Sequence, residues 1–348
     1  MITLPYIEMS AVVCSALIIT LLFIIRITTF VVTDQPSELQ PFIPKKKGGY
    51  AAGPAWVNTG ISIQDFPLFD ATKNSFIVDV ILWFEFDPTE ISFSVLDKFS
   101  FGKGIILKKS PPETIKIKDK LFVRYDLRIQ FSSNLDYKDF PFDNHRVVLS
   151  LSNDIASPEE MMFHVKESSF TFNPSLYTAS WLYISHTVHK GYSTASLEKH
   201  DTGKTVSLPQ VQMVMDFKGG WRKVFVIFVP LYLLSFMGAF TLIMQKDPTF
   251  LSLASISGLL AHRFVVENMS PGVGYFTLSD RLYVIMIIFS FVFFLINLGC
   301  LIWETNLTGT KQILFFLTLI SWNLITYQLV LGRTKKRNHK KNMGRYAI

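Results

Sequence analysis

The stretch between Pro248 and Pro271 constrains the fold of this chain more than any other. It is long enough to cross a hydrocarbon core about 30 Å thick, which takes about 20 helical residues. It nevertheless carries polar side chains along its length, whereas the apolar segments 224–244 and 282–303 carry no charge. A polar helix persists in a bilayer only where its polar groups face protein or water. The pattern predicts the inner wall of an aqueous pathway; a polar seam between helices and a buried helix of a soluble protein are the alternatives. The polar residues are Thr249, Ser252, Ser255, Ser257, His262, Arg263, Glu267 and Asn268.

Five segments reach spanning length: 10–32, 224–244, 249–268, 282–303 and 312–332. None lies between residues 33 and 220, so we expect a multi-pass protein of the cell membrane, the bacterial inner membrane, with a sizeable aqueous part. The first segment has the length of a secretory signal, but Glu8 precedes its apolar core, and no small-residue cleavage site follows it. These features favour a retained helix over a cleaved signal, with Arg26 snorkelling to the interface.

The middle of the chain has the composition of strands. Segments 76–86, 121–131, 146–151 and 211–217 are rich in aromatic and β-branched residues or alternate between apolar and polar ones, and proline-containing turns separate them. Short strands at this spacing predict a β-sandwich. The predicted fold class is a β-sandwich aqueous domain plus a helical transmembrane bundle of four helices, with an additional N-terminal transmembrane helix. The expected parts are a membrane helix at 1–32, a linker at 33–54, the β-sandwich at 55–220, the four-helix domain at 221–332 and a basic tail at 333–348.

The net charge of +7 comes from the tail, because the last sixteen residues hold seven basic and no acidic side chains. A basic tail directly after a spanning helix is expected to contact anionic lipid headgroups. Nucleic acid is not an expected partner, since neither a motif nor aromatic residues accompany these charges. Cys14 and Cys300 both lie in apolar segments, so the aqueous domain offers no disulfide, zinc site or cysteine nucleophile.

No pattern supports catalysis, and we predict no catalytic residue, metal or cofactor. The chain has no glycine-rich phosphate loop, nucleophile elbow, paired glycosidase carboxylates or zinc-ligand spacing. His186 and His189 lie three residues apart, which on a strand directs them to opposite faces. Asp136, Asp139 and Asp143 form an acidic turn without the glycine that a calcium loop needs, so a structural role is favoured.

Two turns carry apolar residues between charged or turn-forming ones. The 136–143 turn holds the tip Phe140-Pro141-Phe142, and the 269–280 link reads MSPGVGYFTLSD. Both are expected where the β-domain meets the helices, and two stiff turns in contact can transmit the shift of a strand to a helix. The alternative is that each turn is only a loop with a hydrophobic anchor.

Four motifs, in order along the chain, resemble the pentameric ligand-gated ion channels, in the prokaryotic form that lacks the Cys-loop disulfide. Segment 76–87 resembles their second strand, and the FPFD sequence at 140–143 resembles their β6–β7 turn. Pro230 resembles the proline of their first membrane helix. Residues 261–284 resemble the end of the second helix, the coupling linker and the start of the third helix. The resemblance covers about residues 57–331, and the helix at 10–32 is extra to the family's four.

The resemblance implies a homopentamer, in which each subunit joins four identical ones around a central pore. An unidentified small ligand, or protons, would act on the β-domain and shift a closed–open equilibrium. The resemblance assigns the pore lining to Asp247, Phe250, Ala254, Ser257, Ala261, Phe264 and Asn268. It assigns gating-coupling roles to Phe140, Pro141, Phe142, Asp143, Pro271, Tyr275 and Thr277. Asp247 at the inner mouth favours cation permeation.

Three alternatives stay open. Polarity alone would direct a different stripe of the pore helix to water, namely Ser252, Ser255, Leu259, His262 and Val266. Trp83, Phe163 and Tyr192 could offer ring faces to a cationic ligand, or could equally be core residues. Phe250 and Phe264 on the expected lining also fit a non-conducting membrane receptor or scaffold that keeps the channel fold.

Membrane orientation divides the predictions. The family places the β-domain and the C-terminus outside the cell, in the periplasm or beyond. That placement would also put Lys45–Lys47 and the basic tail outside, against the tendency of cationic residues to stay in the cytoplasm. The resemblance favours the outside, and the basic tail favours a cytoplasmic β-domain.

Overall fold

A computed structural model of the chain describes residues 4–30, 38–42, 53–70, 75–132, 135–173, 181–196, 205–303 and 307–331. Most of the predicted linker at 33–54, with Lys45–Lys47, and the whole basic tail at 333–348 lie outside the described residues. The chain divides into two compact units. The β unit comprises residues 32–135 and 145–218, and the helix unit comprises residues 1–31, 136–144 and 219–348.

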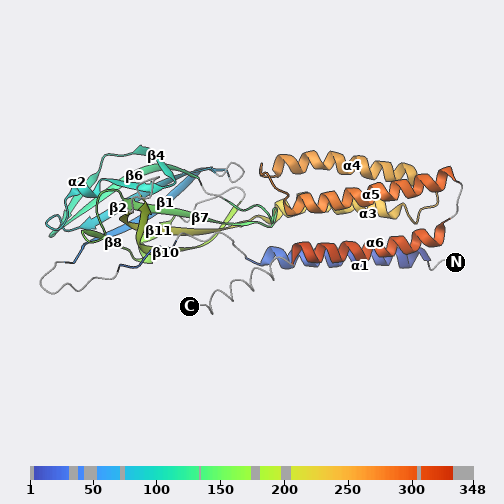
Figure 1. Cartoon of the computed structure of the whole chain (residues 1–348), viewed down its shortest axis with the longest axis horizontal. Coiled ribbons are helices and arrows are strands. Elements are labelled where there is room, and N and C mark those ends of the chain that lie inside the picture. The colour runs from blue at the N-terminus through green and yellow to red at the C-terminus, as the bar shows by residue number, and fades with distance from the viewer. Residues whose placement is uncertain are drawn as a thin grey trace. The chain divides into compact units, whose positions relative to one another are not determined.

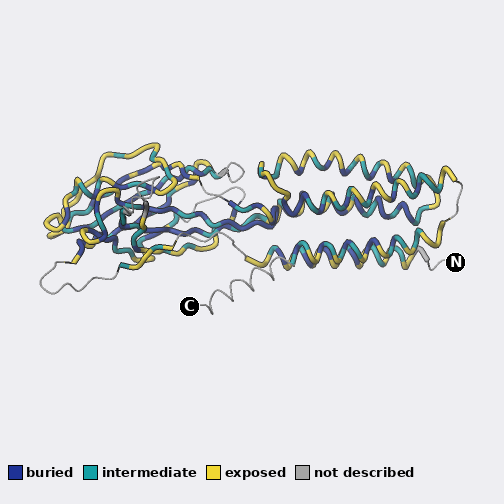
Figure 2. Tube along the Cα trace, in the orientation of Figure 1, coloured by how far each residue is buried: buried dark blue, intermediate teal, exposed yellow. Residues whose placement is uncertain are grey.

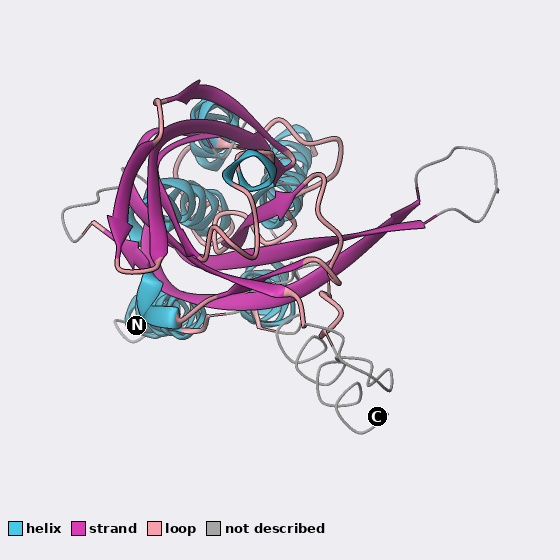
Figure 3. Cartoon of the chain, turned by 90° about the vertical axis from the view of Figure 1, so that its left-hand side faces the viewer, coloured by secondary structure: helices cyan, strands magenta, loops and turns pink. Residues whose placement is uncertain are grey.

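The β unit contains two sheets (Figure 1, Figure 3). The larger has the order β4-β6-β2-β1-β8, with β5 also on β6 and β9 also on β1, and the smaller has the order β10-β11-β7-β3. The strands are β1 Ala55–Asp70, β2 Ser75–Phe86, β3 Phe99–Gly102, β4 Gly104–Lys109, β5 Glu113–Ile117, β6 Lys120–Ser132, β7 Asn144–Asn153, β8 Met161–His164, β9 Phe170–Phe172, β10 Trp181–Ser196 and β11 Thr205–Gly219. A four-residue helix, α2 Phe93–Leu96, and a short 3-10 turn, Glu167–Ser169, connect them.

The core of the β unit follows from the period of two along its strands. Every second residue of β2 is buried, because successive side chains of a strand point to opposite faces. Phe84 of β2 contacts Phe99, Tyr125 and Phe163, with ring centroids 5.6, 6.4 and 6.3 Å away. The four predicted strands lie within β2, β6, β7 and β11, and the prediction of a two-sheet β-domain is confirmed at this level.

The helix unit holds five helices that are long and apolar enough to cross a membrane. They are α1 Leu4–Thr28, α3 Trp221–Phe240, α4 Pro248–Met269, α5 Leu278–Ile302 and α6 Thr308–Val330. Each helix begins earlier than hydropathy alone predicts, and at α4 and α5 residues that favour a helix start account for the difference. Pro248 occupies the first turn of α4, and Thr277 with Asp280 forms a capping box on α5. Five apolar helices indicate a membrane-associated protein; a pore formed by four of them stays a prediction.

Contacts divide the helices into two groups. Helices α3, α4 and α5 pack on one another, and α1 packs along α6 (Figure 1). The amide of Gln312 donates to Glu8 at 3.3 Å, and the amide of Asn323 donates to Ser15 at 2.7 Å. The two residue pairs ascend together in number, so α1 and α6 run parallel.

Candidate functional site

The buried face of α4 is the stripe that polarity alone would have directed to water. Its buried residues are Ser252, Ser255, Leu259, His262 and Val266. The hydroxyl of Ser255 donates to the carbonyl oxygen of Leu234 at 2.8 Å, and His262 Nε2 donates to that of Ile227 at 2.9 Å. Both carbonyls belong to α3. The polar groups of this stripe are therefore satisfied inside the chain.

A close approach of two backbones fixes the rotation of α4. A Cβ atom on Gly238 of α3 would lie 2.8 Å from Ser255 Oγ and 3.2 Å from Ser290 Oγ of α5. Small side chains let helices approach in this way and place hydroxyls where they can bond across the seam. The opposite face of α4 consequently points away from α3 and α5.

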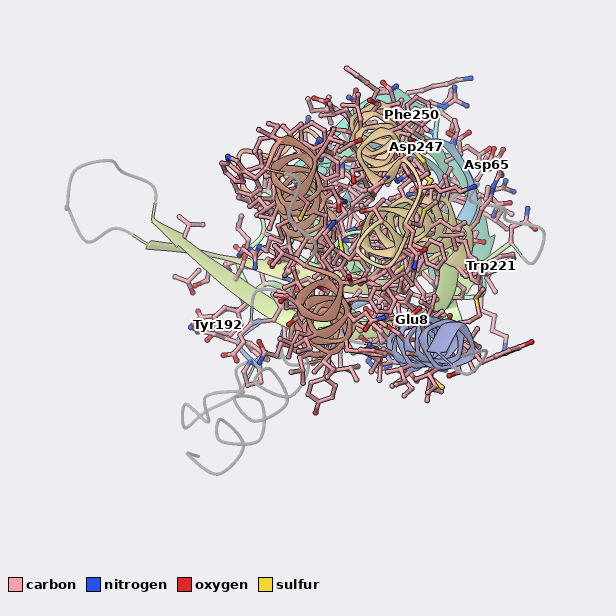
Figure 4. All side chains as sticks on the ribbon, turned by 90° about the vertical axis from the view of Figure 1, so that its right-hand side faces the viewer. Glu8, Asp65, Tyr192, Trp221, Asp247 and Phe250 are labelled. Atoms are coloured by element: carbon pink, nitrogen blue, oxygen red, sulfur yellow. The ribbon has the colours of Figure 1, made fainter. Side chains whose placement is uncertain are left out.

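The stripe that the family resemblance assigns to the pore lies on that outward face. Phe250 and Phe264 are 75% and 69% exposed. Figure 4 shows Asp247 and Phe250 at one end of α4, on the periphery of the helix group. Asp247, Ser257, Ala261 and Asn268 are also exposed, and Ala254 is half-buried. These positions are free to face another subunit or water, and their role as a pore lining stays a prediction.

Each helix has exposed residues along its length (Figure 2), and those of α4 differ in polarity from those of α3, α5 and α6. Away from the helix ends, the exposed residues of α3, α5 and α6 are apolar, such as Leu233, Ile288 and Ile320. The outward face of α4 carries Ser257 at mid-helix and Glu267 and Asn268 near its end. Contact with lipid would be costly for these polar groups, since hydrocarbon offers them no partner.

A buried polar cluster joins four helices at the end of α4 that holds Asp247. The amide of Asn297 on α5 donates to Thr241, which follows α3, at 2.9 Å and to Ser252 of α4 at 3.0 Å. Lys311 of α6 donates to the carbonyl oxygen of Asn297 at 2.8 Å. Asn297 thus fixes the ends of these helices relative to one another.

The two turns singled out in the sequence contact each other. The backbone N–H of Ser279 donates to the carbonyl oxygen of Phe140 at 3.1 Å, and the N–H of Tyr137 donates to the hydroxyl of Tyr275 at 2.9 Å. Phe142 stacks on Phe228 of α3 with ring centroids 5.5 Å apart. The tip of the 136–143 turn is buried throughout, at Phe140, Pro141, Phe142 and Asp143. The structure brings the predicted coupling residues together, and their role in gating stays a prediction.

The 269–280 link is rigid where it enters α5. Pro271 and Thr277 are buried, and the hydroxyl of Thr277 bonds the carboxylate of Asp280. Arg263 of α4 pairs with the other oxygen of the same carboxylate. One carboxylate therefore ties the end of α4 to the start of α5.

Sequence reasoning missed the contact of α1 with the 136–143 turn. Arg26 does not snorkel to an interface as expected; its side chain is 2% exposed and pairs with Asp139 at 3.1 Å. The signal was present, because a cation inside an apolar segment calls for a partner. The partner lies 113 residues away, and a single sequence gives no means of identifying it.

The three ligand-cleft candidates do not form one cage within the chain. Phe163 is 1% exposed and belongs to the core around Phe84. Trp83 neighbours Phe84 on β2 and so points to the opposite face, where it stacks on Phe122 at 5.8 Å. Tyr192 lies on β10 in the other sheet and exchanges two backbone hydrogen bonds with Gln40. Of the three, Trp83 and Tyr192 keep partly exposed rings.

One charged cluster of the β unit shows how its loops are held. Lys109 Nζ donates to Asp97 at 2.7 Å and lies 4.4 Å from the ring centroid of Phe99. Burial alone would raise the pKa of Asp97, but hydrogen bonds from Lys109 and from the hydroxyl of Tyr125 outweigh it and lower that pKa. Burial, followed by the bond to Asp97, raises the pKa of Tyr125. Both groups keep their ordinary charge at neutral pH, which suits a structural role.

Comparisons with known proteins identify no family. No protein-family model matches the chain, and no curated protein matches it either.

Proposed function

We propose that this chain is a subunit of a homopentameric, cation-permeable ion channel that a ligand or protons open by acting on the β unit. What supports the proposal most is the outward face of α4. Unlike the outward faces of α3, α5 and α6, it carries an exposed polar side chain at mid-helix, Ser257, and it continues with Glu267 and Asn268 near its end. Copies of α4 around a central axis would give these groups water and each other as neighbours.

The alternative stripe is a weaker basis for a pore. Its hydroxyls and its imidazole already bond within the subunit, to Thr241 and to carbonyls of α3. Turning that stripe to water would break these bonds and direct the aromatic side chains of Phe250 and Phe264 inward. The outward face requires no such rearrangement.

Cysteine accessibility in the assembled protein tests the pore lining. The chain has two cysteines, so Cys14→Ser with Cys300→Ser gives a cysteine-free background. Ser257→Cys and Ser255→Cys form a matched pair, one exposed and one buried. We expect a charged thiol reagent to modify position 257 and alter conductance, and to leave position 255 unmodified. Modification at 255 without modification at 257 would contradict the proposed lining.

Bilayer recording with the purified oligomer tests permeation and selectivity. We expect a pentamer by native mass and cation current that depends on pH or on an added ligand. Because Asp247 lies exposed beside the first turn of α4, Asp247→Lys should weaken or reverse the cation preference. Glu90→Lys, the same charge reversal at an exposed position of the β unit, is the control. Equal selectivity in Asp247→Lys and the parent would exclude an acidic selectivity ring at this position.

A non-conducting membrane receptor or scaffold with the same architecture is the second candidate. The large exposed rings of Phe250 and Phe264 favour it, since rings from several subunits can close a narrow passage. A pentamer that is silent across pH and ligand screens, and stays silent after Phe250→Ala with Phe264→Ala, would support this candidate over the channel.

A further inference from the structure

We propose that α1 remains in the mature protein as a fixed helix of each subunit, and that Arg26 is a positioning residue that holds the 136–143 turn. The first half stands on the contacts of α1 alone. The second half stands on the contacts of Arg26 with the turn, and only the effect of these contacts on the closed–open balance rests on the proposed channel function.

The contacts of α1 with α6 are specific. Ser15 is 4% exposed and accepts a hydrogen bond from Asn323, and Glu8 faces α6 (Figure 4) and accepts one from Gln312. Ile19 and Leu22, one and two helical turns beyond Ser15, are buried as well. Polar groups inside a membrane bond one another because lipid offers no alternative. A leader that is cut away has no use for such matched partners.

The C-terminal end of α1 enters an aromatic cluster at the 136–143 turn. The ring of Phe23 lies 4.8 Å from that of Phe228, 5.7 Å from that of Tyr232 and 5.5 Å from that of Phe142. Phe142 is the tip of the turn, whereas Phe228 and Tyr232 belong to α3. Aromatic rings at these distances attract one another beyond their burial. Phe23, a residue of α1, therefore links the 136–143 turn to α3.

The Arg26–Asp139 pair is the second contact of α1 with the turn. The exposed fractions of the two side chains are 2% and 9%, and Arg26 also lies 5.9 Å from the ring centroid of Phe142. Removing one partner of a buried ion pair leaves the other charge uncompensated, which is strongly destabilising. Loss of α1 would therefore leave the carboxylate of Asp139 buried without Arg26 and weaken the hold on the turn.

The 136–143 turn is thus held from two sides. Ser279 and Tyr275 of the 269–280 link bond it on one side, and Phe23 and Arg26 of α1 contact it on the other. The turn continues directly into β7. If gating moves this turn, the Arg26–Asp139 pair has a different energy in the closed and open states, and its removal shifts the equilibrium between them.

Disulfide cross-linking and intact mass test the first half on the full chain. In the Cys14→Ser, Cys300→Ser background we expect Ser15→Cys to form a disulfide with Asn323→Cys. Leu17→Cys with Asn323→Cys should not cross-link, because Leu17 is 64% exposed. The purified protein should have the mass of the whole chain, 39.8 kDa in the parent. A mass that lacks the first 30 or so residues, or equal cross-linking of the two pairs, would overturn the inference.

A double-mutant cycle tests the positioning role. Arg26→Ala and Asp139→Ala should each lower the melting temperature in detergent by about 5 °C or more, and the double variant should lose less than their sum. Thr20→Ala, an exposed change on α1, should leave it unchanged. In protein that conducts, Arg26→Ala and Asp139→Ala should each shift the ligand or proton concentration at half-maximal activation by about tenfold. Arg26→Lys should keep this midpoint close to that of the parent.

The outcomes separate this inference from the channel proposal. A protein without current refutes the channel, but cross-linking and coupled melting would still support a retained α1 that braces the turn. Additive losses of melting temperature at Arg26 and Asp139, in protein with normal currents, would refute the brace and leave the channel intact. Should Arg26→Ala not fold, Arg26→Lys and the cross-linking pair supply the decisive measurements.

Discussion

In the β unit, the least exposed side chains are mostly rings and aliphatic chains, whereas in the helix unit hydroxyls and amides share the interior with them. Ser235, Thr241, Asn297 and Thr326 are all at most 1% exposed. The surfaces differ in the opposite sense. Helices α3, α5 and α6 present long apolar faces outward, whereas the exposed large apolar residues of the β unit are scattered, as with Ile105 on β4, Ile155 in a loop and Leu182 on β10.

This inversion shows which solvent each part of the chain is adapted to. Water drives apolar side chains inward, so the β unit is held by burial of surface. Hydrocarbon gives no such drive between helices, and close packing with hydrogen bonds takes its place. The same kind of substitution should therefore have different consequences in the two units. Four tests of this contrast follow, ordered by the size of the expected effect.

The largest difference is expected from removing a ring. Phe84→Ala in the β core should lower the free energy of unfolding by about 3–5 kcal/mol, because it deletes a fully buried side chain and leaves a cavity. Phe291→Ala on the outward face of α5 should change it by less than about 0.5 kcal/mol, since Phe291 is 52% exposed. Thermal unfolding of the reconstituted full chain measures both. Equal losses would show that the outward helix face is packed as tightly as the core.

An intermediate effect is expected from filling the seam between α3, α4 and α5. Gly238→Leu should destabilise the helix unit by about 1–3 kcal/mol, because a Cβ there already meets Ser255 and Ser290. Gly309→Leu on α6 is the control, since a Cβ at that position has no neighbour within 4 Å. The loss of helical circular dichroism on heating in detergent measures the stability of both variants. A stable Gly238→Leu protein would mean that α3 and α4 pack less closely than described.

A smaller effect is expected from the amide in the polar cluster. Asn297→Leu keeps the branched shape of the side chain but removes the bonds to Thr241, Ser252 and Lys311, and should cost about 1 kcal/mol in a bilayer. Gln328→Leu, at an exposed position of α6, should be neutral. Denaturation in mixed micelles compares the two. A stabilised Asn297→Leu protein would show that burial of apolar surface decides stability here, as it does in the β unit.

The smallest effect is expected at the surface of the β unit. The hydrogen bond from Lys120 lowers the pKa of Glu85, so the pair stabilises the fold at neutral pH and loses this contribution as acid protonates the carboxylate. Lys120→Ala should cost less than about 1 kcal/mol at pH 7, because both side chains are partly exposed, and nothing near pH 3. Lys116→Ala on β5 is the control. A cost that persists at pH 3 would assign the effect to packing of the lysine stem.

The sequence predicted secondary structure most reliably where a segment has a single hydrophobic period and lies in a single solvent. The alternation in β2 and β6 and the apolar length of the helices could be predicted, because each depends only on which nearby residues are apolar and which are polar. The rotation of α4 about its own axis could not be predicted in this way. Both of its stripes carry polar residues, and the choice depends on carbonyls of Ile227 and Leu234 in another helix. The family resemblance favoured the face that the subunit leaves uncovered.

The α1 contacts were beyond sequence reasoning for a different reason. The partner of Arg26 is an aspartate that also fits a local turn, and Asp136 and Asp143 flank it as equal candidates. Likewise Phe163 is of an aromatic type that suits a ligand contact, but it is buried in the core. In both cases the residue type is informative, but its neighbours come from remote parts of the chain.

The polar cluster around Asn297 has a mechanical consequence. It joins α3, α4, α5 and α6 at one end, so α4 is anchored near Ser252, and the bonds of His262 and Arg263 are those that would have to yield for its Asn268 end to move. A helix rises 1.5 Å per residue, which puts Asn268 about 24 Å from that anchor, and a tilt of about 5° would swing it by about 2 Å. Any rocking of α4 thus works as a lever, with its fulcrum at Asn297 and its longest stroke beside the 269–280 link.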